Sequence, residues 1–379
     1  MRRMIEKHTF DTKISKGRVA MRRVRQYTKI CVLLLLCALL FVGCTTQTAS
    51  LPGLPQARGM TPLIKDVPLD KPSEEIVISF VGDLNMAAEV RYETWGACFN
   101  EFAKRVGPAY FLQNVAPVFQ SDDLTVGDVE NVFSDSGLAR ADKGDEAYAY
   151  WYRSGSENAQ ILSVSGIEIG SIANNHTMDF GVQGYEDTKA ALDAVGVMWG
   201  DETRACYVER KGIRIGVFCS KLFGSGQLTP ILEWLESEEA RACDYRIVYF
   251  HGGTERIYQP EASKQQMCRR LIDQGAQLVI GSHPHVLQPM EEYNGGYIVY
   301  SLGNFLFGGS RTCENETVIY QQILTLQEGK IVSQSYRMIP CNCYTDTVDT
   351  PYQPAIVTDE AQKQRIIDYM HGRCDSPML

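Results

Sequence analysis

The stretch IVISFVGD, residues 76–83, decides the fold class. A run of β-branched and aromatic residues ends here in glycine and aspartate, which is typical of a buried strand followed by a turn. Similar runs recur along the chain and predict further strands. They are DLTVGDVE (123–130), IEIGSIANNH (167–176), IRIGVFCS (213–220), YRIVYFHGG (245–253), AQLVIGSHPH (276–285) and GYIVYSLGNF (296–305).

Helix-like stretches lie between many of these predicted strands. They cover residues 98–120, 184–196, 228–240 and 261–276. Such an alternation of strands and helices predicts an α/β layered fold. The segment 317–340 has a different pattern, which predicts an antiparallel hairpin that turns around Glu328 and Gly329.

The N-terminal residues predict export. Basic residues precede thirteen uninterrupted apolar residues that end before Gly43 and Cys44. A hydrophobic run of this length suits a secretory signal peptide over residues 1–44, and its end resembles a bacterial lipobox with Cys44 as the lipidated residue. The alternative is a short uncleaved membrane anchor. Either reading places the remaining chain on the outer face of the bacterial cytoplasmic membrane.

The rest of the chain divides into three predicted parts. Residues 45–74 are rich in Thr, Ser, Pro and Gly, which predicts a flexible linker. The folded domain is predicted over residues 75–345, and residues 346–379 are predicted to be a C-terminal tail.

The charge distribution bears on the partners. The whole chain has a net charge of −9, and residues 2–29 hold ten basic and two acidic residues, a net charge of +8. Removing that segment therefore leaves −17. Because nucleic-acid binding depends on clustered Lys and Arg, we expect no nucleic-acid partner. A polyanionic substrate would need local compensation, such as a bound cation.

Polar side chains follow most of the predicted strands. Four of the six histidines lie there: His176, His251, His283 and His285. Carboxylates and amides do so too: Asp83, Asp128, Glu130, Asn174, Asn175 and Asn304. Ligands of α/β sheets bind beyond the carboxyl ends of the strands, so we expect these side chains to converge. Such a donor set without thiolate suits a divalent Mn, Zn, Fe or Mg ion.

The segment GSHPH, residues 281–285, carries two of these histidines. On its own, such a segment is more often a surface turn than a ligand pair, and only the clustering with the other strand ends favours a site. A residue before proline prefers an extended conformation. Residues i and i+2 of an extended chain point to the same side, so both imidazoles are expected to face one site.

Six motifs in this order resemble the bacterial capsule-synthesis protein family CapA, which is associated with poly-γ-glutamate. The motifs are FVGDLNM, LTVGDVEN, IANNHTMDFGVQGYEDTKAALDAVGV, YFHGGTE, VIGSHPHVLQP and YSLGNFLF. This family is in turn similar to the calcineurin-like metallophosphoesterases. The resemblance, over roughly residues 76–308, implies a four-layer metallophosphatase-like β-sandwich flanked by helices.

The resemblance also implies roles for the strand-end residues. Asp83 would bind one metal ion, Asp128 or Glu130 would bridge two, and Asn175 would bind the second. His251, His283 and His285 would complete the ligand set. His176 would lie near the leaving group as a general acid. The residues implied in support of these ligands are Asn174, Asp179, Glu255 and Asn304.

Three positions depart from the related patterns. Asn85 stands where metallophosphoesterases have a ligand histidine. The second motif offers two carboxylates, Asp128 and Glu130, where CapA proteins usually have Asn-x-Glu. Gly252 replaces the tryptophan that follows the histidine of the fourth motif.

Together these features predict a lipid-anchored CapA-like protein in the synthesis, export or attachment of a poly-γ-glutamate-like anionic surface polymer. Its chemistry would be metal-dependent hydrolysis or transfer, and its partners would include the membrane and a membrane synthase complex. The alternative is a non-catalytic polymer-binding or assembly factor that keeps the fold. A generic exported phosphoesterase is disfavoured by Asn85.

Overall fold

The computed structural model describes residues 74–93, 96, 98–145, 149–309, 314–344 and 352–378. The predicted signal peptide (1–44) with Cys44, and the predicted linker up to residue 73, lie outside the described residues. Within the described ranges, no helix combines the length and the apolar character needed to cross a membrane.

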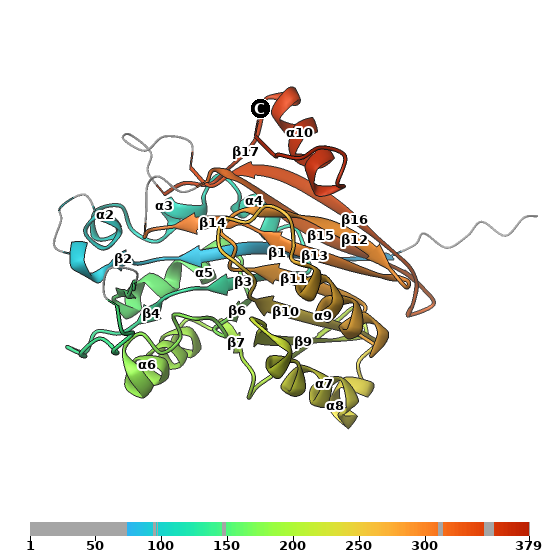
Figure 1. Ribbon diagram of the computed structural model, residues 1–379, viewed down its shortest axis with the longest axis horizontal. Coiled ribbons are helices and arrows are strands. Elements are labelled where there is room, and N and C mark those ends of the chain that lie inside the picture. Colours follow the sequence, from blue (N-terminus) through green and yellow to red (C-terminus); the bar gives the residue numbers. More distant parts are fainter. Residues whose placement is uncertain are drawn as a thin grey trace, which may run out of the picture. The chain divides into compact units, whose positions relative to one another are not determined.

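The first large sheet is centred on β1 (Figure 1). β1 pairs in parallel with β3 on one side and antiparallel with β15 on the other. The spatial order is β17 (Ala355–Ile356), β16 (Lys330–Asn342), β15 (Glu316–Gln327), β1 (Glu74–Asn85), β3 (Leu124–Val129), β6 (Ile169–Ser171) and β7 (Met198–Gly200), with β14 (Asn304–Phe307) paired to the end of β1. β15 and β16 form the predicted hairpin, and Glu328 and Gly329 turn it with φ of 53° and 74°.

The second large sheet has a parallel centre and antiparallel edges. Its order is β12 (Leu287–Tyr293), β13 (Gly296–Leu302), β11 (Leu278–Ser282), β10 (Tyr245–His251), β9 (Ile213–Lys221) and β8 (Cys206–Arg210). A third, small sheet consists of β2 (Ala88–Glu89), β5 (Tyr152–Ser154) and β4 (Val132–Phe133).

Both faces of the second sheet are buried, as the alternation along β10 shows. Ile247 and Tyr249 belong to the apolar core that the two large sheets share. Val248 and Phe250 belong to a separate core that includes residues of helices α7 and α9. Successive side chains of a strand point to opposite faces, so β10 lies between the first sheet and a helical layer.

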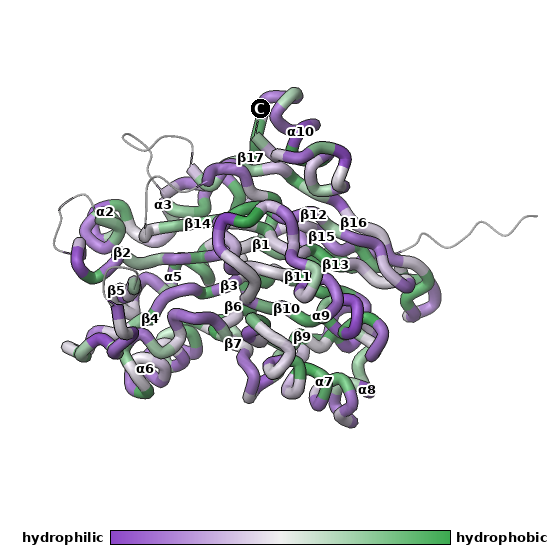
Figure 2. Tube along the Cα trace, viewed as in Figure 1, coloured by the Kyte–Doolittle hydropathy of each residue, from purple (hydrophilic) through white to green (hydrophobic). Residues whose placement is uncertain are grey.

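Helices cover the outer faces of both sheets. The first sheet shares a core with helices α2 to α6, and the second with α7 to α9. The helices are α2 (Phe99–Val106), α3 (Ala109–Leu112), α4 (Ala116–Phe119), α5 (Gln160–Ser165), α6 (Gly181–Ala194), α7 (Leu228–Glu236), α8 (Glu238–Arg241), α9 (Ala262–Asp273) and α10 (Glu360–Met370), with 3-10 turns at Val90–Tyr92, Ser156–Ala159 and Ser225–Gln227. Figure 2 shows hydrophobic and hydrophilic residues alternating along several of these elements. The predicted four-layer α/β sandwich is therefore confirmed.

The predicted C-terminal tail contains α10, which packs on β12 and β16. Its residues Ile366, Tyr369 and Met370 are fully buried in the core between the sheets. Asp359 caps its N-terminus by accepting a hydrogen bond from the backbone of Gln362. This helix is thus an integral part of the folded domain.

Candidate metal centre

The carboxyl ends of parallel strands from both sheets meet at one place. In the first sheet, Asp83 of β1 is in register with Asp128 of β3. In the second sheet, His251 of β10 is in register with Ser282 of β11. Other side chains join them from the loops after β3, β6 and β11 and from the first residue of β14: Glu130, Asn174, Asn175, His176, His283, His285 and Asn304.

Asp128 organises the buried side of this site. Its Oδ2 atom lies 2.5 Å from Nδ1 of His251 and accepts a hydrogen bond of 2.8 Å from the hydroxyl of Ser282. Its Oδ1 atom accepts from the amide of Asn174 at 3.2 Å. Because a carboxylate only accepts, Nδ1 of His251 carries the hydrogen. With that hydrogen on Nδ1, Nε2 is the nitrogen that would bind a metal ion, in place of its 2.7 Å contact with Oδ1 of Asn175.

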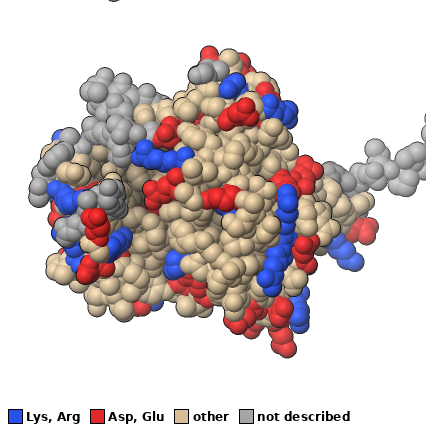
Figure 3. Space-filling view, viewed as in Figure 1, with Lys and Arg blue, Asp and Glu red and all other residues tan. Residues whose placement is uncertain are grey.

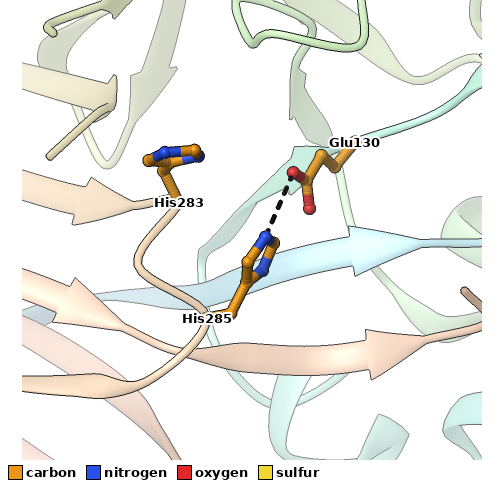
Figure 4. Close-up of side chains that lie close together, drawn as sticks. All are labelled: Glu130, His283 and His285. Atoms are coloured by element: carbon orange, nitrogen blue, oxygen red, sulfur yellow. Dashed lines mark ion pairs between the residues drawn. The ribbon is translucent and has the colours of Figure 1, made fainter. Parts of the chain in front are cut away.

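Three imidazoles surround Glu130. The Nε2 atom of His251 lies 3.7 Å from its Oε1 atom, and those of His176 and His285 lie 3.8 Å from it. Figure 4 shows His285 and Glu130 pointing toward each other, with His283 beside them. Glu130 is fully buried, and neither carboxylate oxygen has a hydrogen-bond partner among the described residues. Burial raises the pKa of this carboxyl well above its usual value, as does the charge of Asp83, although His285 opposes this.

The loop with the two histidines does not have the predicted extended backbone. His283 has a φ of 96° and His285 a φ of 58°, so both lie in the left-handed region that residues other than glycine avoid. The prediction of an extended chain was therefore wrong, although both imidazoles lie at the site. Such conformations cost about 1–3 kcal/mol each and persist only where the surroundings impose them.

His285 lies between an acid and an amide. Its Nδ1 atom is 3.2 Å from Oδ2 of Asp83 and 3.0 Å from Oδ1 of Asn304. Burial disfavours protonation of this ring, but the Glu130 charge and the bond to Asp83 outweigh burial and raise the pKa of His285 to about 10. Burial likewise opposes ionisation of Asp83, but the contacts with His285 prevail and lower the pKa of that carboxyl. Without a cation, a protonated His285 thus balances part of the buried negative charge.

His176 is held from its far side. Its Nδ1 atom lies 2.9 Å from Oδ2 of Asp179, which also accepts from the backbone of Tyr152 and forms an ion pair with Lys143. This contact directs Nε2 toward Glu130. Burial lowers the pKa of His176 and so favours the neutral ring, although Asp179 acts in the opposite direction.

The donor groups fit divalent cations. Two sets of donors have ligand atoms within 4.8 Å of one another: Asp83, Asp128 and His251, and Glu130, His283 and His285. Among the described residues, the oxygens of Glu130 have no hydrogen-bond partner, because the 3.7–3.8 Å separations from the surrounding imidazoles are too long for hydrogen bonds. Metal–ligand bonds of about 2.1 Å allow donors at such separations to share one ion. The residues present therefore fit the predicted metal.

Two of the predicted residues, Asn175 and Glu255, lie at the exposed side of the site. Asn175 is exposed, and its Oδ1 atom lies 2.7 Å from Nε2 of His251. Glu255 is also exposed, and its charge raises the pKa of Glu130 and His285, but it makes no hydrogen bond to these residues. Glu255 therefore influences Glu130 and His285 through its charge, and it does not hold either side chain by a hydrogen bond.

Two departures from the related patterns have structural reasons. The side chain of Asn85 donates to the backbone carbonyl of Glu130 at 3.1 Å and accepts from the backbone of Ala87 at 3.2 Å. It thus supports the loop of Glu130. A Cβ atom at Gly252 would lie 2.2 Å from the carbonyl oxygen of Leu222, so the backbone approach leaves no room for a side chain.

Ser282 and Phe223 contact the site and were not predicted from the sequence. Ser282 contacts Asp128, and the ring of Phe223 packs edge-on against His283 with centroids 4.8 Å apart. Ser282 directly precedes the two histidines in sequence, and its place at the end of an apolar run could have indicated it. Phe223 is 43% exposed at the site and had no comparable sequence signal.

Comparison with known proteins assigns the chain to a family. The family described as "Bacterial capsule synthesis protein PGA_cap" matches residues 77–309. The chain is 32% identical over 266 residues to the PGA biosynthesis protein CapA of Bacillus subtilis (strain 168), which covers 64% of this chain and 66% of that protein. It is 27% identical over 277 residues to the capsule biosynthesis protein CapA of Bacillus anthracis, which covers 65% and 64%. The match thus spans just under two thirds of the length of these relatives.

Similarity to solved structures is weaker. A novel phosphatase from Mycoplasma pneumoniae matches at 14% identity and a TM-score of 0.43, over 71% of this chain and 94% of that chain. A hypothetical protein from Thermus thermophilus matches at 15% identity and a TM-score of 0.42, over 70% and 99%. These scores are too low to inform the site, but the family match covers more than half of the chain and every strand-end residue described above. The chain therefore belongs to the bacterial capsule synthesis protein family PGA_cap.

Proposed function

We propose that this chain is an exported, lipid-anchored protein that acts on a poly-γ-glutamate-like capsule polymer during its synthesis, export or attachment. Its chemistry would be hydrolysis or group transfer at a divalent-cation site. The family supports the capsule role, and the names of the Bacillus relatives support poly-γ-glutamate as the polymer.

One observation carries the chemical part of the proposal. Glu130 is a fully buried carboxylate whose oxygens lack hydrogen-bond partners in the described chain, and imidazole nitrogens surround it. Burying a carboxyl group without hydrogen bonds is costly, and buried carboxylates are normally paired with cations or bound to metal ions. Mn, Zn, Fe and Mg all remain candidates for this donor set.

A divalent cation bound there would polarise a scissile carbonyl or phosphoryl group and make water more acidic. The chain's own groups would orient the reactants and move protons. Asp179 fixes the ring of His176 through Nδ1, so Nε2 is the atom that would take up a proton and later give it to a leaving group. Because burial lowers the pKa of His176, the ring is neutral at rest, so it would have to take up a proton before it could give one to a leaving group.

The proposal also accounts for how an acidic protein could accept a polyanion. Figure 3 shows Lys and Arg interspersed with Asp and Glu on the face drawn, without a continuous basic patch among the described residues of that face. In this proposal, the cation site attracts the carboxylate groups of the polymer.

Turnover assays test the chemical part. Purified full-length chain would be incubated with poly-γ-glutamate and with generic phosphodiesters under Mn, Zn and Mg, beside His285→Ala and His371→Ala variants. His371 is the matched control because its ring contacts Tyr336 and the backbone of α10. We expect turnover by the wild type and the control and loss of turnover with His285→Ala. Equal turnover by His285→Ala would contradict the proposal.

A second candidate function is a non-catalytic polymer-binding or assembly factor. The side chain of Asn85 favours it, because its contacts with backbone groups replace the histidine ligand of metallophosphoesterases. Two results together would select this function. The purified chain would retain metal but turn over neither poly-γ-glutamate nor phosphodiesters, and cells with Asp83→Asn would form an unchanged capsule.

Export and anchoring form a separate part of the proposal, since they depend on residues 1–44. Membrane fractionation of cells that express Cys44→Ala tests it. Release of this variant from the membrane is expected if Cys44 is lipidated, and continued membrane association would favour an uncleaved anchor. Pull-down from the membrane fraction would test association with a polymer synthase complex.

A further inference from the structure

The C-terminal helix α10 reaches the two loops that border the metal centre. Tyr369, on its last turn, is fully buried, and its hydroxyl contacts the carbonyl oxygens of Tyr258 and Leu287, the latter at 3.0 Å. The helix lies beyond residues 77–309, the part of the chain that the family match covers. The family match therefore carries no information on how this helix connects to the site.

These two carbonyl groups belong to different loops. Tyr258 lies in the loop 252–261, which directly follows His251. Leu287 begins β12, two residues after His285. The loops also contact each other, since the backbone amide of Arg256 donates to the carbonyl of Pro284 at 2.8 Å. The Tyr369 hydroxyl thus joins the segments that follow two predicted metal ligands.

Buried polar groups on other elements join the same loops. Nζ of Lys264, on α9, donates to the carbonyl of Gly252 at 3.0 Å and to Oε1 of Gln288 at 2.8 Å. The amide of Gln288 in turn donates to the carbonyl of Ile257 at 2.6 Å. Lys264 and Gln288 are almost completely buried. The two loops are therefore tied together at several points beneath the site.

The loop with the histidines needs such support. His283 and His285 both have positive φ, a conformation that persists only where neighbouring groups impose it. Helix α10 is well placed to support this loop. Its residues Ile366 and Met370 are buried in the core between the sheets and fix the position of the helix. A hydroxyl fixed to this helix therefore restrains the backbone on the C-terminal side of His285.

We propose that Tyr369 is a positioning residue of the cation site, whose hydroxyl holds the loop 252–261 and the segment 283–287 in the arrangement that directs His283 and His285 toward Glu130. This role rests on the proposed function, because it assumes that these imidazoles bind a cation. The hydroxyl acts through the backbone and touches neither the ligands nor the substrate.

A matched pair of variants tests the proposal in the full-length chain. Tyr369→Phe keeps the ring and removes only the hydroxyl. Tyr336→Phe removes a hydroxyl that lies 2.9 Å from Nε2 of His371, at the end of the same helix, and it contacts neither loop. Hydrogen–deuterium exchange of the metal-free protein reports on the loops, since the amides of Arg256 and His283 donate to Pro284 and to Oδ1 of Asp83.

We expect Tyr369→Phe to speed exchange in segments 253–258 and 283–288 by roughly fivefold, the equivalent of one lost hydrogen bond. We also expect it to weaken Mn²⁺ binding, measured by titration calorimetry, about tenfold. Tyr336→Phe should leave both quantities at the wild-type value, while the thermal midpoints of the two variants stay similar.

Two other results would contradict, separately, the positioning role of Tyr369 and the proposed function on which it rests. Exchange and Mn²⁺ affinity of Tyr369→Phe equal to those of Tyr336→Phe would overturn the positioning role and leave Tyr369 a packing residue. A wild-type chain that binds none of Mn²⁺, Zn²⁺, Fe²⁺ and Mg²⁺ would overturn the metal-dependent part of the proposed function, and the exchange of the metal-free protein would still decide whether Tyr369 positions the loops.

Discussion

The Nδ1 atom of His251 lies 2.5 Å from Oδ2 of Asp128, although the two residues are 123 positions apart in the chain. This contact joins the carboxyl end of β10 in one sheet to that of β3 in the other. It also fixes the ring nitrogen that carries the hydrogen, so Nε2 remains available as a ligand. The candidate metal centre therefore depends on groups that orient Asp128 and His251.

Ser282 is one such group, and its removal should weaken metal binding. Its hydroxyl donates to the same Oδ2 atom of Asp128 at 2.8 Å. We expect Ser282→Ala to lower Mn²⁺ affinity about tenfold, as is usual for residues that orient metal ligands, in titration calorimetry. Ser220→Ala is the control, because Ser220 is equally buried but its hydroxyl donates to the backbone of Lys221. Equal affinities of the two variants would contradict the orienting role.

Gly252 should tolerate no side chain. A Cβ atom there would meet the carbonyl oxygen of Leu222 at 2.2 Å, and a backbone atom cannot rotate away. We expect Gly252→Ala to lower the free energy of unfolding by about 1–3 kcal/mol, measured by urea denaturation. Gly137→Ala, which has open space around its Cβ position, should change it by less than about 0.5 kcal/mol. An unchanged stability of Gly252→Ala would show that the loop of Leu222 moves freely.

Asp122 should make stability depend on pH. Burial raises the pKa of its carboxyl from 3.8 to about 6, although the hydroxyls of Ser79 and Thr125 partly oppose this. The folded state thus binds more protons than the unfolded state between these values, so this group's contribution to stability falls as the pH rises from below 4 to above 6.

Asp122→Asn removes this ionisation and keeps an acceptor for the hydroxyl of Thr125. We expect the variant to be more stable than the wild type by about 1 kcal/mol at pH 7.5, a value reduced for the partial exposure of the group. The difference should shrink at pH 4.5. Urea denaturation at both pH values measures it, and a difference that is constant with pH would contradict the raised pKa.

The central strands and their polar ends could be predicted from the sequence. Buried parallel strands such as IVISFVGD are continuous apolar runs, and their ends in Asp83 and His251 follow directly. Strands of two or three residues, such as β2 and β4, have no periodicity to detect. The edge strand β12 was also missed, since Pro289 argues against a strand.

The details of the site depended on contacts that sequence does not contain. The positive φ of His283 and His285 is imposed by groups distant in the chain, so local preferences before proline predicted the wrong backbone. Tyr369 lies 84 positions beyond His285 in a segment predicted to be a tail, and only the packing of α10 brings it to the loops.

The metal content of the purified full-length chain tests the central claim most directly. Wild type, Glu130→Gln, His283→Ala with His285→Ala, and the control His371→Ala would be purified alike and measured by elemental mass spectrometry. We predict at least one divalent transition metal or magnesium ion per chain in the wild type and the control, and little or none in the other two proteins. A wild type that contains no such ion and takes up none on dialysis against Mn²⁺, Zn²⁺, Fe²⁺ or Mg²⁺, or site variants that retain as much as the control, would contradict a cation site at Glu130.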